Sequence, residues 1–432
     1  MDAVILATDT SPLTLPVCGM PLVRRLLYTL RAAGVRKAFI VLPPDLRSLP
    51  PAPGDVPGVV VRHGSLGEAL EDQEAPLLLV DGDIVLDERI ARLALAQSKP
   101  TVLYDSEVDT IPQVRVEDGR LARVGEGLGQ TSGGYVGLAV CPPSWLRTIP
   151  SGGRNWPGAL DRIARAHPIE AIDIAQVDPY APGMRRAVKP FWQRVRSPAD
   201  AKRCRDLLLD SAQKGTLDLV AWYINRPAEN WIVRRIADLP VTPNQVSLLT
   251  NLVAYGVPLL FLTHHFLPGV ALALVVNVLD GVDGKLARVK GLASHLGHLE
   301  HSFDLLYEQA WYLSFYWALY LQTRNLLFPA LGTVMVLLDS FSRHCSMQFK
   351  QITGVSLADY APFDRWFRRW DGRRNIYSFH LLLAVLIGWP VLAAGSMVAH
   401  ALLTAGIYAW RAATHLRRID LGRPRPPTQL LE

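Results

Sequence analysis

Four carboxylate side chains stand between two long apolar runs of this 432-residue chain. The stretch LDGVDGKLARVKGLASHLGHLEHSFD, residues 279–304, contains Asp280, Asp283, Glu300 and Asp304. It follows FLPGVALALVVNV and precedes LLYEQAWYLSFYWALYL, and both runs are typical of helices in lipid. Carboxylates are costly in hydrocarbon and are kept there mainly for a function. This stretch is therefore the first candidate for a chemical site.

The spacing of these acids predicts that they converge. Asp280 and Asp283 are three residues apart and share a face of a helix, and Glu300 and Asp304, four apart, do the same on the next helix. A tight turn through KGLASH (290–295) would bring the two faces together. Four carboxylates in a low-dielectric site cannot all stay ionised without cations. The pattern thus predicts two hard divalent ions, the usual arrangement for phosphoryl-type displacement.

Small and basic residues accompany the acids in the same stretch. Gly281 and Gly284 would let a ligand approach the backbone closely. Ala287 would keep that face open for a bulky group. Lys285 and Arg288 would supply positive charge for phosphates.

The combined pattern resembles the signature of the CDP-alcohol phosphatidyltransferases, which are six-helix membrane enzymes. It reads Asp280-x2-Asp283-Gly284-x2-Ala287-Arg288-x8-Gly297-x2-Glu300-x3-Asp304. The family has one residue more after the second glycine and an aspartate at the position of Glu300. The spacing of the last two acids is kept, and glutamate still offers a carboxylate, so we expect activity to be retained.

The resemblance implies roles for these residues. Asp280, Asp283 and Glu300 would hold Mg²⁺ or Mn²⁺, and Asp304 would complete the metal site and act as the general base. Gly284, Ala287 and Arg288 would contact the CDP of a donor from which a second alcohol displaces CMP. An ion-coupled transporter also carries intramembrane acids, but it has no need of the glycine, alanine and arginine.

Six apolar segments have the length needed to cross a bilayer as helices. We predict spans at 244–264, 267–287, 299–322, 326–345, 375–393 and 396–412. Basic residues gather before the first span, in the loop 346–374 and in the C-terminal tail. The positive-inside rule then places both termini and the acids at the cytoplasmic face. This predicts a multi-pass protein of a bacterial or archaeal cytoplasmic (inner) membrane.

Residues near the spans extend the candidate site. TPNQVS (242–247) resembles the start of the family's first helix, where Asn244 would form a hydrogen bond in the nucleotide pocket. A structural explanation fits the same segment equally well, with Thr242 as a helix N-cap. Arg343 and Arg374 are candidates for a phosphate on the acceptor or a lipid headgroup, although membrane anchoring explains most basic residues here. Glu308, one turn beyond Asp304, would bind acceptor hydroxyls or pair with a basic neighbour.

The sequence pattern of the N-terminal half predicts an α/β domain with a parallel sheet. A strand (3–7), a helix (21–33) and a second strand (38–42) form a βαβ unit. The layout resembles sugar-phosphate nucleotidyltransferases, and Asp83, after the strand APLLLVD, matches their metal-binding acid. The family's glycine-rich loop is missing, because TDTSP follows the first strand. We therefore expect a degenerate, inactive domain that serves as a scaffold or a regulatory nucleotide site.

The predicted organisation is an α/β Rossmann-like, nucleotidyltransferase-like domain (1–210), an amphipathic juxtamembrane helix (211–241), an all-α six-helix transmembrane domain (242–420) and a tail (421–432). This order resembles the bifunctional inositol-phosphate cytidylyltransferase/di-inositol-phosphate-phosphate synthases. The partners implied are a CDP-alcohol donor (CDP-diacylglycerol or a CDP-polyol), an alcohol or polyol-phosphate acceptor, the bilayer and a second copy of the chain.

Composition sets limits on the function. The net charge is +6, and the basic residues are clustered in particular loops. This pattern indicates an anionic lipid surface or phosphate ligands as partners, more than nucleic acid. The four cysteines are scattered and indicate neither disulfides nor a zinc site. Two alternatives stay open: a bifunctional enzyme that also makes its CDP-alcohol from CTP, and a non-catalytic membrane binding protein.

Overall fold

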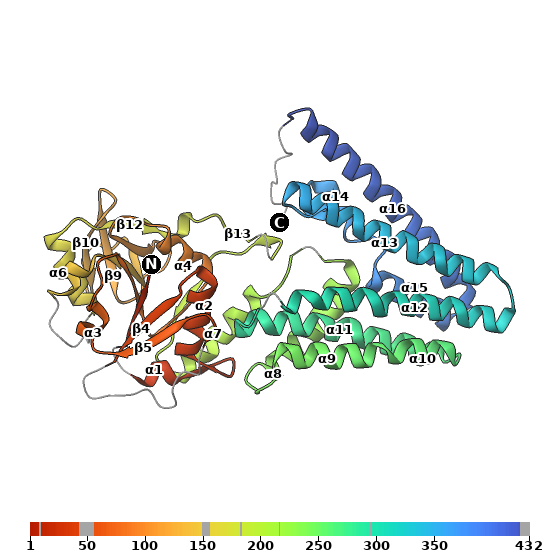
Figure 1. Cartoon of the computed structure of the whole chain (residues 1–432), viewed down its shortest axis with the longest axis horizontal. Coiled ribbons are helices and arrows are strands. Elements are labelled where there is room, and N and C mark those ends of the chain that lie inside the picture. Colours follow the sequence, from red (N-terminus) through yellow and green to blue (C-terminus); the bar gives the residue numbers. More distant parts are fainter. Residues whose placement is uncertain are drawn as a thin grey trace. The chain divides into compact units, whose positions relative to one another are not determined.

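The computed structural model describes residues 1–7, 10–42, 56–148, 156–181, 184–215, 217–293 and 296–423. These residues form two compact units (Figure 1). The first comprises Met1–Tyr180, Val188–Ser211 and Val289–Gly291, and the second comprises Ala181–Ala187, Ala212–Arg288 and Leu292–Glu432. Three features of the sequence lie partly outside the described residues: the TDTSP loop, the turn through KGLASH and the C-terminal tail.

The first unit contains a nine-stranded mixed sheet, in the order β5-β4-β1-β6-β11-β8-β12-β10-β9. The predicted βαβ unit is confirmed: β1 (Ala3–Leu6) pairs in parallel with β4 (Lys37–Val41), and α2 (Leu22–Ala33) connects them. On its other side β1 pairs in parallel with β6 (Leu77–Asp81). The sheet therefore has the parallel centre that the sequence predicts.

Further strands complete this unit and one hairpin of the second. They are β2 (Pro16–Val17), β3 (Met20–Pro21), β5 (Val60–Gly64), β7 (Ile84–Leu86), β8 (Thr101–Asp105), β9 (Gln113–Glu117), β10 (Arg120–Gly125), β11 (Gly133–Cys141), β12 (Glu170–Asp173), β13 (Tyr180–Ala181), β14 (Arg186–Ala187) and β15 (Trp192–Arg194). The other helices of the first unit are α1 (Thr10–Thr14), α3 (Leu66–Leu70), α4 (Glu88–Leu95), α5 (Pro143–Leu146), α6 (Trp156–Ala166), the 3₁₀ turn η1 (Ile174–Gln176) and α7 (Pro198–Ser211).

Both faces of the sheet are covered, which explains why its central strands are apolar throughout. Ala3 and Ile5 of β1 pack into a core with residues of α2 and α4. Val4 and Leu6 point to the opposite face and pack into a second core with residues of α3 and α6. Strands buried on both faces read as continuous apolar runs because successive side chains alternate between the faces.

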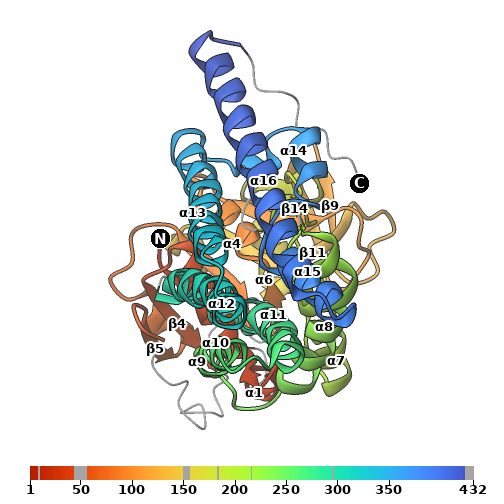
Figure 2. The same ribbon diagram turned by 90° about the vertical axis from the view of Figure 1, so that its right-hand side faces the viewer.

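The second unit is helical apart from the hairpin of β13 and β14. It contains the π-helical turn η2 (Ala221–Asn225), α8 (Arg226–Ile236), α9 (Pro243–Ala254), α10 (Gly256–Leu262), α11 (Phe266–Lys290), the 3₁₀ turn η3 (Leu296–Leu299), α12 (Glu300–Thr323), α13 (Leu327–Thr353), the 3₁₀ turn η4 (Leu357–Asp359), α14 (Pro362–Phe367), α15 (Arg374–Leu386) and α16 (Pro390–Asp420). Figure 2 views α9 to α12 nearly end-on, side by side.

The six predicted spans overlap with α9–α10, α11, α12, α13, α15 and α16. Among the described helices, three are both long and apolar enough to cross a membrane: Pro243–Leu262, Phe266–Lys290 and Pro390–Asp420. By contrast α15 has only 13 residues, and α12 carries Glu300, Asp304 and Glu308. The number of spanning helices therefore stays a prediction.

Two predicted boundaries are wrong. The fifth helix ends at Leu386 rather than near 393, and the sixth begins at Pro390 rather than near 396. Gly388 has a φ of 77°, which favours glycine, and Pro390 occupies the first turn of α16, where its missing N–H costs nothing. The juxtamembrane helix is also shorter than 211–241, because α7 extends to Ser211 and α8 ends at Ile236.

Candidate active site

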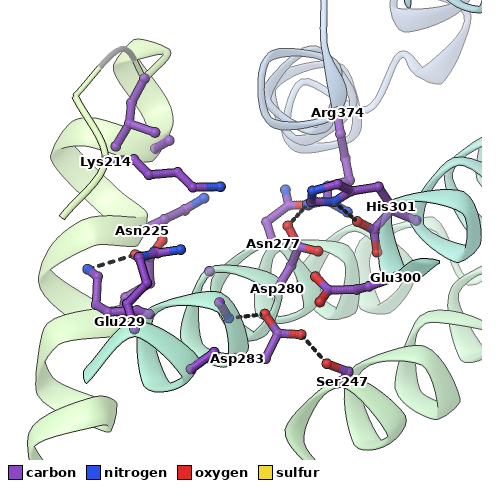
Figure 3. Close-up of a pocket in the computed structure, with 18 of the residues that line it drawn as sticks. Lys214, Asn225, Glu229, Ser247, Asn277, Asp280, Asp283, Glu300, His301 and Arg374 are labelled. Carbon is purple, nitrogen blue, oxygen red and sulfur yellow. Dashed lines mark hydrogen bonds and ion pairs between the residues drawn. The ribbon is translucent and has the colours of Figure 1, made fainter. Parts of the chain in front are cut away.

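A cavity of about 550 Å³ lies within the second unit and is lined by all four acids of the sequence pattern. Figure 3 labels three of them, Asp280, Asp283 and Glu300. This volume falls in the range of pockets that hold small molecules and cofactors. The helices α8, α9, α11, α12 and α13, together with the first residues of α15, contribute its walls. Eight basic and seven acidic side chains line it, so it is a highly charged pocket within an apolar helical domain.

The two acids of α11 have different partners. Asp283 accepts a hydrogen bond of 2.6 Å from Ser247 Oγ of α9 and another from the backbone N–H of Gly284. Asp280 forms an ion pair with Arg374 at the start of α15 and accepts a 3.4 Å contact from the Tyr307 hydroxyl. Asp283 is therefore held by neutral hydrogen-bond donors, whereas Asp280 is held by a guanidinium group.

The acids of α12 form the group best placed for a metal ion. One potential ligand atom each of Glu300, His301 and Asp304 lies within 4.8 Å of the others. His301 Nδ1 is 3.4 Å from Asp304 Oδ2. Carboxylate oxygens suit Mg²⁺ and Mn²⁺, and an imidazole is an acceptable ligand for Mn²⁺. The residues present therefore fit a divalent ion, with Asp280 and Asp283 facing the same cavity.

Arg343, Arg374 and Glu308 form one charged network at the pocket wall. Glu308 pairs with Arg343 and lies 3.2 Å from Arg374 Nη1. Arg343 Nε also donates to Asp339 Oδ2 at 2.9 Å. The structure thus shows the pairing of Glu308 with basic neighbours, which was one of its two expected roles.

Of the five residues expected to bind CDP, one has surroundings that differ from the expectation. Asn244, Gly284, Ala287 and Arg288 line the cavity. Lys285 differs from the expectation that it supplies charge to phosphates, because its side chain is only 1% exposed. Its ammonium group instead contacts the side-chain oxygens of residues before and within α8: Gln213 (2.8 Å), Glu229 (3.0 Å) and Asn230 (2.6 Å).

Packing within the protein, and not only a ligand, requires glycine in α11. A Cβ on Gly281 would lie 2.2 Å from Glu229 Oε1, closer than real atoms approach. A Cβ on Gly284 would meet Arg288 Nη1 at 3.3 Å. The close approach at Gly281 is therefore made by Glu229 of α8, whereas the sequence suggests a ligand.

Sequence reasoning missed several residues of this pocket. His301 is adjacent to Glu300, and the four-residue spacing of Glu300 and Asp304 gives no indication of it. Ser247, Arg185 and Lys214 also line the cavity, but they lie outside the acid-bearing stretch. Thr242 is the N-cap of α9, with a complete capping box to Gln245, which bears out the structural role suggested for it.

The acids of the first unit are neutralised by its own arginines. Arg194 Nη1 lies 2.7 Å from Asp83 Oδ1, and its Nη2 lies 2.8 Å from Asp81 Oδ2. Arg196 Nε lies 2.6 Å from Asp83 Oδ2. Burial, and secondarily the neighbouring Asp83, raise the pKa of Asp81 to about 6 despite the opposing effect of Arg194. Asp83, expected as a remnant metal ligand, thus already has two cationic partners.

Comparisons with known proteins agree with the site. Residues 240–359 match the family CDP-alcohol phosphatidyltransferase. This region begins just before α9 and includes all four acids. The part of the helical unit that contains the four acids therefore matches this family.

The relatives share one name, "Bifunctional IPC transferase and DIPP synthase". The protein from Rubrobacter xylanophilus is 29% identical over 303 residues, which cover 63% of this chain and 65% of the relative. That from Archaeoglobus fulgidus is 25% identical over 359 residues, covering 76% and 66%. That from Thermococcus kodakarensis is 36% identical over 109 residues, or 24% of each chain. The chain spans less than two thirds of the length of these relatives.

Two solved structures each resemble less than half of this chain. The inositol-1-phosphate CTP transferase from T. maritima has a TM-score of 0.37 at 14% identity, over 46% of this chain and 90% of that one. The Mycobacterium tuberculosis phosphatidylinositol phosphate synthase (PgsA1) with CDP-DAG bound has a TM-score of 0.36 at 14% identity, over 48% of this chain and 98% of that one.

Proposed function

We propose that the chain is an integral membrane CDP-alcohol phosphotransferase that joins an acceptor alcohol to the phosphoryl-alcohol part of its donor and releases CMP. The observation that carries this proposal is the convergence of Asp280, Asp283, Glu300 and Asp304 on one cavity. All four acids lie in the region of residues 240–359 that matches the family. The product is a phosphodiester, either a phospholipid or an inositol phosphodiester.

The proposed reaction is an in-line displacement at phosphorus. The acceptor oxygen forms a bond to the phosphorus that carries the donor alcohol, and the bond from that phosphorus to the CMP oxygen breaks. Asp304 takes the proton of the acceptor hydroxyl as general base. Asp280, Asp283, Glu300 and Asp304 would hold two Mg²⁺ or Mn²⁺ ions, which supply charge stabilisation for the attacking and leaving oxygens.

The cavity offers separate surfaces for the two substrates. Gly284, Ala287, Arg288 and Asn244 would line the CDP part of the donor. The network of Arg343, Arg374 and Glu308 would face the acceptor or its phosphate. In the structure Arg374 is paired with Asp280, so the binding of metal ions and acceptor would require this arginine to exchange partners.

We propose that the protein is multi-pass in a bacterial or archaeal cytoplasmic membrane, with both termini and the pocket on the cytoplasmic side. Exposed apolar residues before and within α8, namely Trp222, Tyr223, Ile224 and Trp231, support a juxtamembrane helix that lies against the bilayer. Arg226 and Arg235 stack over Trp222 and Trp231, as expected at a membrane interface. A homodimer follows only from the family resemblance.

A second candidate is a bifunctional enzyme, which the name of the relatives favours. Its N-terminal domain would make the CDP-alcohol from CTP. The ion pairs of Arg194 and Arg196 with Asp81 and Asp83 argue against a metal-dependent reaction there. We therefore propose that this domain is inactive and that a separate cytidylyltransferase supplies the donor.

The test is CMP release by the purified full-length protein in detergent with Mg²⁺ or Mn²⁺. CDP-diacylglycerol and CDP-inositol serve as donors, and inositol and inositol phosphate as acceptors. Asp304→Asn should lower the rate by about 10²-fold or more without changing the unfolding temperature, whereas Asp210→Asn, in α7 outside the pocket, should not. Metal-dependent CMP release that survives Asp304→Asn would refute the assigned base, and no release with any donor would refute the function. CTP turnover by the same protein would favour the bifunctional candidate.

A further inference from the structure

Lys214 is a cation of the cavity whose ammonium group forms no hydrogen bond or ion pair with the residues that the structure describes. It lies between α7 and η2, outside the region matched by the family. Figure 3 shows its side chain extending toward the acids of α11 and α12. Burial, with Arg288 and Arg185 nearby, lowers the pKa of this lysine, whereas Asp280 and Glu300 act in the opposite direction.

Arg185 reaches the same cavity from the hairpin of β13 and β14. Its Nε donates to Asp359 Oδ2 at 2.5 Å, while its Nη2 is buried and has no hydrogen-bond partner among the described residues. A buried unpaired donor costs free energy unless a ligand satisfies it. The guanidinium therefore has one nitrogen available for a further acceptor.

The hairpin and the segment of Lys214 are held together, although they are far apart in sequence. The N–H of Gly215 donates to the carbonyl oxygen of Met184 at 2.8 Å, and Arg186 Nε donates to the carbonyl oxygen of Gln213 at 2.7 Å. A Cβ on Gly215 would lie 2.5 Å from the Arg185 oxygen, so only glycine permits this approach. The two cations are thus placed on adjoining, fixed segments.

Most other cations of the pocket already have acidic partners. Arg343 and Arg374 pair with Glu308, and Lys285 pairs with Glu229. Arg368 and Arg373 both pair with Asp371, whose pKa burial would raise but the two arginines hold below its usual range. Lys214 and the free nitrogen of Arg185 are therefore available charge on this side of the cavity.

We propose that Lys214 and Arg185, beside Arg288, form a phosphate-binding subsite of the transferase. This inference rests on the proposed function and adds to it two residues from outside the matched domain. The pocket residues alone are nearly balanced in charge, with eight basic and seven acidic side chains. Two divalent ions at the acids would leave a positive excess, which phosphate groups of the substrates offset. The ligand is a phosphate carried either by the donor or by the acceptor.

The experiment measures KM for each substrate with the full-length protein in detergent and Mg²⁺. The variants are Lys214→Met, Lys214→Arg, which keeps the charge, and Lys350→Met, which removes an exposed lysine of α13 outside the pocket. Lys214→Met should raise one KM roughly tenfold, as expected for the loss of a charged hydrogen bond. Lys214→Arg should restore most of the affinity, and Lys350→Met should change nothing.

The substrate whose KM rises identifies the phosphate. A higher KM for the CDP-alcohol assigns the subsite to the donor diphosphate. A higher KM for inositol phosphate but not for inositol assigns it to the acceptor. Unchanged KM values in Lys214→Met, with CMP release intact, would overturn the subsite while leaving the function in place.

A binding measurement separates the two hypotheses if the wild-type protein releases no CMP. Inorganic pyrophosphate with Mg²⁺ is then titrated by calorimetry into the wild-type protein and Lys214→Met. Binding that is about tenfold weaker in the variant would support the subsite even though the function had failed. Equal binding, or none to either protein, would overturn the subsite too.

Discussion

Arg374 at the start of α15 forms an ion pair with Asp280 of α11, and both residues line the candidate active site. The sequence suggests separate roles for them, a metal ligand and an acceptor-binding arginine. In the structure the guanidinium neutralises the carboxylate and also lies 3.2 Å from Glu308. Arg374 therefore competes with any cation that Asp280 would bind.

We predict that Arg374→Gln makes the protein more dependent on divalent ions. Without metal, Asp280 loses its cationic partner, and stability should fall by about 1–3 kcal/mol. With Mg²⁺, the ion meets no competing guanidinium, so the metal should raise the unfolding temperature more in the variant than in the wild type. The measurement is thermal unfolding in detergent with EDTA and with Mg²⁺. Arg369→Gln, which removes an exposed arginine outside the pocket, is the control, and equal metal shifts in all three proteins would contradict the prediction.

The parts predictable from sequence were those encoded by local spacing. Asp280 and Asp283 on one helix, and Glu300 and Asp304 on the next, needed only helical periodicity. The strand predicted at 3–7 and the helix predicted at 21–33 followed from apolar patterning, and they agree with β1 and α2 to within one residue at each end. Lys214 and Arg185 could not be found in this way, because backbone contacts between distant segments place them in the pocket. The partner of Lys285 was missed for the same reason, since Glu229 lies 56 residues earlier.

We predict that the acids of the first unit do not bind a divalent ion until their arginines are removed. Asp81 and Asp83 share Arg194, and two neighbouring carboxylates otherwise need a cation. Hydroxyl-radical cleavage by protein-bound Fe²⁺ should therefore map to α11 and α12 of the wild-type protein. The double variant Arg194→Met/Arg196→Met should gain cleavage near β6. Arg203→Met, which removes an exposed arginine of α7, should not. Cleavage near Asp83 in the wild type would show that the site still binds metal.

The pKa of Asp81 predicts how the stability of the first unit depends on pH. Burial is the main cause of its rise from 3.8 to about 6. The folded state then holds a proton that the unfolded state releases, so stability is greatest below pH 4 and falls as pH rises to about 6. The loss is at most about 3 kcal/mol. Hydrogen exchange of β6 in the full-length protein, corrected for intrinsic rates, should show this slope, and Asp81→Asn should remove it. A wild-type slope that persists in the variant would assign it to another group.

Gly281 and Glu229 give the sharpest test of how α8 packs against α11. In Gly281→Ala, the new methyl group would lie 2.2 Å from the Glu229 carboxylate, which must move. Lys285, almost fully buried, would then lose its ion pair at 3.0 Å. We expect a loss of about 1–3 kcal/mol in unfolding free energy and a lower rate of CMP release. Gly395→Ala in α16 is the matched control, because a Cβ there meets nothing within 4 Å; it should be neutral or stabilise by less than about 1 kcal/mol. If the two variants unfold at the same temperature, Glu229 is not fixed against α11, and the packing that positions Lys285 must differ from the one described.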